Sequence, residues 1–81
     1  MTEDIQQNNM EKIIIIGAGG HAAEIVDYFE SVNRLLNYNK YEIAGLIDDN
    51  VMNYKHYEFK YEFLGSIEEH EIKESNLYVM G

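Results

Sequence analysis

The sequence predicts an α/β fold with a mostly parallel sheet, whose elements follow the order β-α-β-β-α-β. Two observations carry this prediction. Lys12–Ile16 is a β-branched run that ends at a glycine, which is typical of a strand buried on both faces. From Gly20 to about Leu36, apolar residues then recur three and four positions apart, as in an amphipathic helix. A buried strand followed by such a helix predicts a layered sheet with right-handed crossovers.

The middle of the chain is expected to contribute two more strands. Tyr41–Ile47 has the composition of a second buried strand, and Val51–His56 is expected to be irregular and polar. In Tyr57–Phe63, aromatic residues alternate with charged ones. This alternation predicts a strand with one solvated face, placed at an edge of the sheet or in a hairpin.

The last elements and the first residues complete the expected organisation. Ser66 and Glu69 fit a capping box, which predicts a short helix ending near Lys73. Asn76–Met80 is expected to be the final strand. Residues 1–10 are polar and lack sustained periodicity, so we expect a disordered tail followed by one domain over residues 11–81.

Composition narrows the classes of function. The chain of 81 residues has a net charge of −9, which disfavours nucleic acid and anionic membranes as partners. An anionic ligand must therefore be held by local backbone dipoles. The absence of cysteine excludes disulfides and thiolate metal sites. No apolar run approaches the roughly 18 residues of a membrane span, so we expect a cytoplasmic protein.

The glycine-rich stretch after the first strand is the main candidate for a binding site. Residues 17–22, GAGGHA, fit the pattern G-x-G-x-x-[G/A] between a strand and a helix. In this pattern Gly17 permits a tight turn, Gly19 lets a ligand approach the backbone, and Ala22 lets the helix pack closely. Free N–H groups at the helix start bind phosphate without a basic side chain. The alternative is a purely structural tight turn.

Two common nucleotide sites fit this loop poorly. The Lys-Ser/Thr pair of a P-loop is absent, which argues against ATP hydrolysis. A dinucleotide site expects an acidic residue about 20 residues beyond the glycines. Asp48 closes the second strand but comes 28 residues after Gly20. The second mononucleotide-binding half is also missing.

Three side chains near the expected carboxyl edge of the sheet are candidates for ligand contact. His21 lies at the helix start, where it either contacts a ligand or caps the first turn. Asp48 and Asp49 either accept hydrogen bonds from ribose or base groups or form a solvated turn. His56 and His70 lack companion ligands at useful spacing, so no metal site is expected.

Three stretches together resemble a known family. IIIIGAGGHAAEIVDYF, EIAGLIDDN and FLGSIEE, in this order, are similar to the N-terminal domain of PglD/NeuD-type sugar O- or N-acyltransferases, over Lys12 to Gly81. The resemblance implies a small Rossmann-like three-layer domain that binds a UDP-linked amino sugar. The substrate-binding residues that it implies are Gly17, Ala18, Gly19, Gly20, His21, Asp48, Asp49 and Gly81.

The resemblance also implies a chemistry that this chain does not complete. The family transfers acetyl from acetyl-CoA to a sugar amine or hydroxyl in polysaccharide biosynthesis. Its catalytic histidine and acetyl-CoA cleft lie in a left-handed β-helix that is absent here. We therefore assign no catalytic residue, and none of His21, His56 or His70 takes the role of base. No cofactor is expected on this domain itself.

Several alternatives stay open at the level of sequence. The chain is an excised domain, a truncated gene product or a stand-alone protein. Two alternatives to a nucleotide-sugar domain also stay open. One is a stand-alone NAD- or nucleotide-binding regulatory module, and the other is an assembly domain without a ligand. Strand 76–80 would lack the helix that covers it in the family, so we expect self-association.

Overall fold

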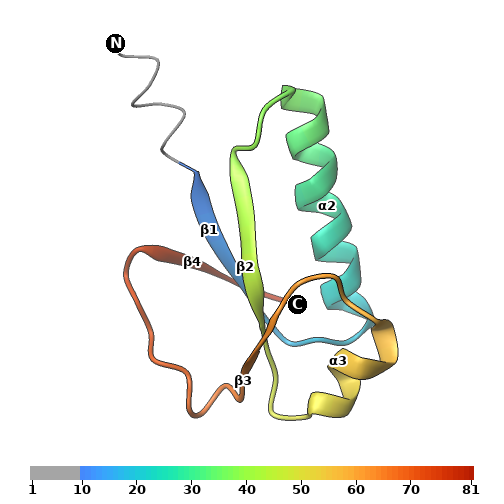
Figure 1. Ribbon diagram of the computed structural model, residues 1–81, viewed down its shortest axis with the longest axis vertical. Coiled ribbons are helices and arrows are strands. Elements are labelled where there is room, and N and C mark those ends of the chain that lie inside the picture. The colour runs from blue at the N-terminus through green and yellow to red at the C-terminus, as the bar shows by residue number, and fades with distance from the viewer. Residues whose placement is uncertain (1–9) are drawn as a thin grey trace.

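The computed structural model describes residues 10–81; apart from Met10, the tail expected at residues 1–10 lies outside the described residues. The predicted fold class is confirmed: four parallel strands form one sheet in the order β3-β2-β1-β4, a Rossmann-like arrangement (Figure 1). The elements are β1 (Glu11–Ile16), α2 (Gly20–Leu36), β2 (Tyr41–Ile47), α3 (Val51–Tyr57), β3 (Phe63–Gly65) and β4 (Asn76–Met80).

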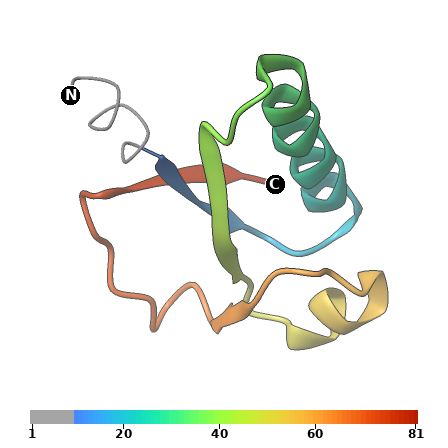
Figure 2. The same cartoon turned by 45° about the horizontal axis from the view of Figure 1, so that its top comes forward.

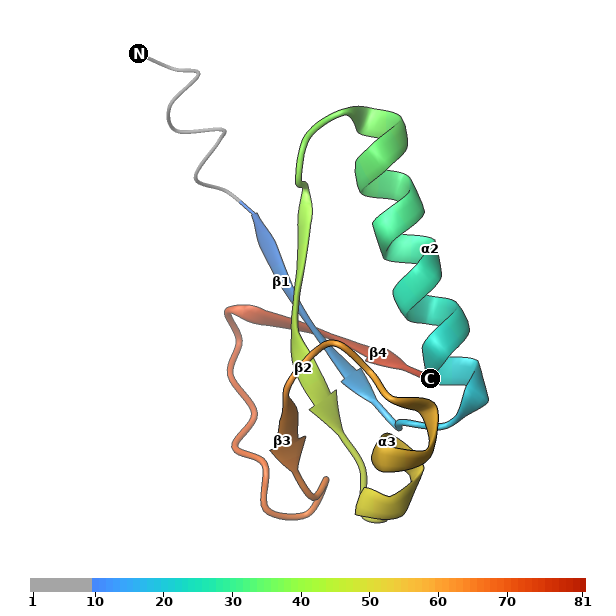
Figure 3. The same ribbon diagram turned by 45° about the vertical axis from the view of Figure 1, so that its right-hand side comes forward.

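The main core lies between the sheet and the helices. Ile13 and Ile15 of β1 are fully buried and belong to one cluster with Ala22, Val26 and Phe29 of α2. Tyr54 of α3 packs against the same cluster, so both helices cover the same side of the sheet (Figure 3). The apolar stripe predicted for α2 is buried at Ala22, Val26 and Phe29, whereas Leu36 at the end of the helix is exposed.

The connection from β3 to β4 runs on the side of the sheet away from the helices (Figure 2). It is tied to β4 by Tyr78, whose hydroxyl lies 2.9 Å from Nε2 of His70 and accepts the Lys73 N–H at 3.1 Å. These two bonds hold an irregular segment in place. The Lys73 N–H would bond to a carbonyl within a helix, and here the Tyr78 hydroxyl satisfies it instead.

The element order is corrected in the middle of the chain: it is β-α-β-α-β-β. Residues expected to be irregular form α3, because the Asn50 side chain accepts the Met52 N–H at 3.0 Å and caps a helix. The strand expected over Tyr57–Phe63 is wrong for most of its length. Tyr57 ends α3, Glu58 adopts a left-handed conformation at φ 52°, and only Phe63 joins β3.

The helix expected from Ser66 to about Lys73 is also wrong. Half of the capping box forms, because the Ser66 hydroxyl accepts the Glu69 N–H at 3.1 Å, but the turn does not continue. Ile67 and Ile72, which would have to supply the apolar side of such a helix, are exposed. A short helix without a buried face gains too little from packing to form.

Two further predictions concern the surface. Neither helix in residues 10–81 has the length and apolar content that a membrane crossing requires. β4 lies at one edge of the sheet, and its Leu77 and Met80 side chains are exposed. Self-association through this edge stays a prediction.

Candidate functional site

The glycine loop joins the carboxyl end of β1 to the start of α2. Gly17 turns the chain at φ 109°, a conformation that favours glycine, and its N–H donates to the Ile47 carbonyl at 2.6 Å. Ala18 is fully buried, and Gly19 is the N-cap residue of α2 in an extended conformation. The loop is thus held against the ends of both central strands.

The end of β4 also packs against the loop. A Cβ on Gly81 would stand 2.9 Å from Cα and Cβ of Ala22, and a Cβ on Gly17 would stand 3.0 Å from the Gly81 carbonyl oxygen. The close helix packing predicted for Ala22 is therefore made against Gly81, and only small residues fit at these three positions. Whether Gly17, Ala18 and Gly81 also contact a ligand stays a prediction.

The start of α2 has the properties of an anion site. Among residues 10–81 no side chain caps the helix, and its first turn contains no acidic residue, so no residue of the helix start itself neutralises the positive end of the helix dipole. A Cβ on Gly19 would meet no atom of residues 10–81 within 4 Å, which leaves the backbone there open to a ligand. A chain of net charge −9 needs backbone dipoles to hold an anion, and the start of α2 supplies them.

Asp48 connects the glycine loop to α3. Its Oδ2 accepts the Ala18 N–H at 2.9 Å and the Asn53 side-chain amide at 3.3 Å, and its Oδ1 accepts the Asn50 N–H at 2.8 Å. Burial raises the pKa of Asp48, but the hydrogen bonds from Asn50, Asn53 and Ala18 outweigh it and lower the pKa below the ordinary 3.8. The carboxylate therefore holds the site together, and a ligand contact by it stays a prediction.

Asp49 holds the connection that follows β3. Its Oδ1 accepts the Ile67 N–H at 3.1 Å, and the side chain is exposed. The two aspartates thus lie at the carboxyl edge of the sheet, as their sequence positions predict. They bind different parts of the chain, and any ligand contact by Asp49 also stays a prediction.

Two aromatic side chains flank the first turn of α2. His21 is exposed, and its Nδ1 lies 3.4 Å from a carboxylate oxygen of Glu24 one turn further on. Tyr57, at the end of α3, approaches from the other element: a Cβ on Gly20 would stand 3.2 Å from its hydroxyl oxygen. The open part of the loop at Gly19 is therefore bordered by two groups able to hydrogen-bond.

The other histidines lie in local aromatic contacts. The His56 ring packs edge to face with Tyr57, and His70 bonds Tyr78. No group of three metal-ligating side chains occurs among residues 10–81.

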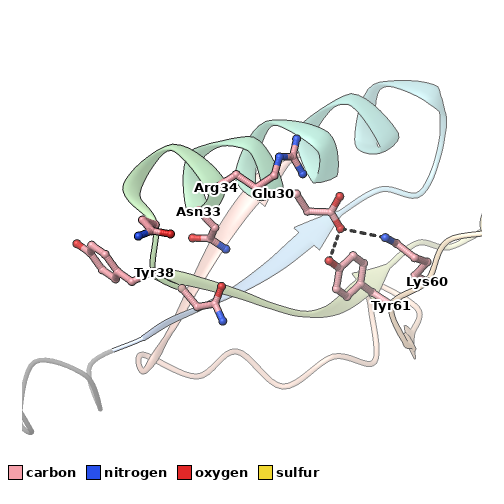
Figure 4. A pocket seen from close by; sticks show the side chains of 8 residues that line it. Glu30, Asn33, Arg34, Tyr38, Lys60 and Tyr61 are labelled. Atoms are coloured by element: carbon pink, nitrogen blue, oxygen red, sulfur yellow. Dashed lines mark hydrogen bonds and ion pairs between the residues drawn. The ribbon is translucent and has the colours of Figure 1, made fainter.

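An open depression lies at the opposite end of α2, about 760 Å³ in volume (Figure 4). Its main charged groups satisfy one another: the Tyr61 hydroxyl donates to Oε2 of Glu30, and Lys60 lies 3.5 Å from the same oxygen. Asn33 is occupied as well, since it bonds the backbone of Lys40 and Tyr41. The contacts of Tyr61 and Lys60 with Glu30 therefore hold the segment before β3 against α2. This depression is not the candidate site.

Sequence reasoning missed Tyr57 and Asn53 as parts of the site. Tyr57 was expected to begin a strand, and Asn53 lay in a stretch expected to be irregular. The signal was Asp48 with Asn50, a pair typical of an Asx turn that starts a helix. Recognition of that turn would have placed α3, and with it Tyr57, at the carboxyl edge of the sheet.

The comparisons with known proteins agree with this geometry. A family model described as the PglD N-terminal domain matches residues 12–81. No curated protein and no solved structure matches the chain. The matched range begins in β1 and includes the glycine loop, both aspartates and Gly81.

Proposed function

Since the chain belongs to the PglD N-terminal domain family, which forms part of PglD-type sugar acetyltransferases, we propose that it binds the nucleotide sugar for a bacterial enzyme of this type. The ligand class is a UDP-linked amino sugar. The observation that supports this proposal most directly is the uncapped start of α2, open above Gly19 and free of acidic residues in its first turn. A diphosphate is the part of the ligand that such a helix start binds best.

The described residues serve binding and orientation in this proposal. The backbone at Gly19 and Gly20 receives the diphosphate, and His21 lies at the rim, where it meets the sugar or a phosphate oxygen. Asp48 keeps the loop in shape through its bond to the Ala18 N–H. The acetyl group comes from acetyl-CoA: the sugar amine or hydroxyl gives a proton to a base and attacks the thioester carbonyl, the C–S bond breaks, and coenzyme A leaves as the thiol. No described residue is assigned to that step.

The substitution Gly19→Ala tests the binding role of the loop. Gly19 has φ −90°, which alanine adopts readily, and the added Cβ meets no atom within 4 Å. We expect a change of at most about 1 kcal/mol in the free energy of unfolding, because alanine is a poorer N-cap but restricts the unfolded chain. The methyl group would occupy the space proposed for the diphosphate, so affinity for UDP should fall at least about tenfold, or about 1.4 kcal/mol.

The affinities are measured by calorimetric titration of the wild type and Gly19→Ala with UDP, UDP-N-acetylglucosamine, NAD and coenzyme A. We expect the wild type to bind UDP and the UDP-sugar, and the variant to bind both weakly while its melting temperature stays within about 8 °C of the wild-type value. Binding of NAD without any response to UDP or the UDP-sugar would favour the regulatory dinucleotide module instead. Equal affinities of wild type and variant would remove the loop from the binding site.

A further inference from the structure

We propose that Tyr57 is a specificity-determining residue, whose hydroxyl donates a hydrogen bond to the diphosphate of a ligand on the glycine loop. This inference rests on the proposed function, because it assigns a further contact within the same site. It concerns a residue on α3, an element separate from the loop.

The position of Tyr57 carries the inference. A Cβ on Gly20, the first residue of α2, would stand 3.2 Å from the Tyr57 hydroxyl oxygen and 3.6 Å from Cζ. The absence of a side chain at Gly20 therefore lets the phenol reach the backbone of the helix start. The space above Gly19 is open, so a ligand there would lie beside the hydroxyl.

The hydroxyl of Tyr57 is available to a ligand. The residue is 45% exposed, and its hydroxyl makes no hydrogen bond to any residue between positions 10 and 81. Tyr54, Tyr61 and Tyr78, in contrast, each use the hydroxyl in a bond within the protein. A phenol that brings its polar end to a binding loop, with no hydrogen-bond partner in the described part of the chain, is suited to donate to a ligand.

The surrounding structure holds Tyr57 in this place. Glu58 ends α3 in a left-handed conformation. The Tyr57 ring packs edge to face with His56, at 4.7 Å between ring centroids, and its centroid lies 6.3 Å from that of Phe59. Asp48 joins α3 to the loop, because one carboxylate oxygen accepts from both Asn53 and Ala18. Asp48 is thus a positioning residue for the Tyr57 contact.

The chemistry suits a strongly acidic chain. With 6 basic residues against 15 acidic ones, the chain has few cations to offer a diphosphate. A phenolic O–H is a neutral donor. Its hydrogen bond to a charged phosphate oxygen is stronger than a hydrogen bond between two neutral groups. Tyr57 would add a side-chain donor to the backbone donors of the helix start, and so favour a diphosphate over an uncharged ligand.

The test compares the affinity of the full chain for UDP and for uridine in the wild type, Tyr57→Phe and Tyr38→Phe. Phenylalanine keeps the ring and removes only the donor. Tyr38 is 59% exposed and lies beyond the far end of α2, so Tyr38→Phe is the matched control. We expect Tyr57→Phe to raise the Kd for UDP about tenfold, with no change for uridine, which lacks phosphates. The control should match the wild type for both.

The outcomes separate this inference from the proposed function. If the wild type binds UDP and the Kd of Tyr57→Phe for UDP lies within twofold of the wild-type Kd, the Tyr57 contact alone is overturned. An equal loss for UDP and uridine also overturns it, because the hydroxyl would then act on the nucleoside or on the loop. Failure of the wild type to bind UDP overturns the proposed function, and the Tyr57 contact with it. Equal melting temperatures of the two variants confirm that folding is not the cause.

Discussion

Asp48→Asn should weaken the fold much more than the loss of one surface charge would. The Asp48 carboxylate accepts three hydrogen bonds, from the Ala18 N–H, the Asn50 N–H and the Asn53 side chain. Asparagine keeps one acceptor oxygen. With that oxygen in the place of Oδ2 it keeps the bonds from Ala18 and Asn53, but its NH₂ group then faces the Asn50 N–H; in the other orientation the NH₂ group faces the Ala18 N–H. Either way at least one bond to a charged, partly buried acceptor is lost and two donors face each other, which amounts to about 2–3 kcal/mol in the free energy of unfolding.

The same residue makes stability depend on pH in a defined direction. The pKa of Asp48 is lower in the folded protein than its ordinary 3.8, so the folded state binds its proton less readily than the unfolded chain. Its contribution is complete above the unfolded pKa and is lost as the pH falls through the folded pKa. The difference between wild type and Asp48→Asn should therefore be constant near neutral pH and shrink below about pH 4.

Thermal unfolding followed by circular dichroism measures this effect, with Asp49→Asn as the control. Asp49 accepts one bond, from the Ile67 N–H at 3.1 Å, and the asparagine oxygen can keep it. Both variants remove one negative charge from a chain of net charge −9, so their difference isolates the hydrogen bonds. We expect the melting temperature of Asp48→Asn to lie about 10–20 °C below that of Asp49→Asn. Variants within about 0.5 kcal/mol of each other would refute the role assigned to Asp48.

Two further substitutions test the packing of the sheet and of the segment before β3. Gly45→Ala should destabilise the fold by about 1–3 kcal/mol in urea unfolding, because its Cβ would stand 2.6 Å from the Glu62 carbonyl oxygen; a stability equal to that of Gly19→Ala would contradict this. Tyr61→Phe removes the hydrogen bond that most lowers the pKa of Glu30, while burial and Glu30 raise the pKa of Tyr61 to about 12. We expect the Glu30 pKa to rise in an NMR titration and a loss of about 1 kcal/mol; an unchanged Glu30 pKa would show that the bond does not form in solution.

Local patterns were sufficient to predict the elements whose apolar residues face the core. The β-branched run of β1 and the apolar spacing of α2 predicted both elements closely, because each pattern matches the period of the structure that it forms. Turn chemistry was equally local: α2, predicted to run to about Leu36, ends there, and Asn37 follows at φ 64° with its N–H donated to the carbonyls of Asn33 and Arg34. The glycine loop belongs to the same class, since its turn depends on residues within it.

The segment from Val51 to Lys73 differs most from the prediction. α3 buries no residue, so no apolar pattern announces it, and its start depends on the Asn50 cap. The alternating aromatics do predict alternating burial: Phe59, Tyr61 and Phe63 are partly buried and the charged residues between them are exposed. Of the residues from Tyr57 to Phe63, only Phe63 pairs in the sheet, opposite Leu46 of β2.

The sequence by itself determined the fold class, the glycine loop and the family to which the chain belongs, because these depend on residues close together in the chain. Only the tertiary structure decided what Asp48 and Tyr57 do. Asp48 meets the Ala18 N–H across 30 positions, and Tyr57 meets Gly20 through α3. Such contacts between residues far apart in the chain exist only once parallel strands bring their carboxyl ends to one edge.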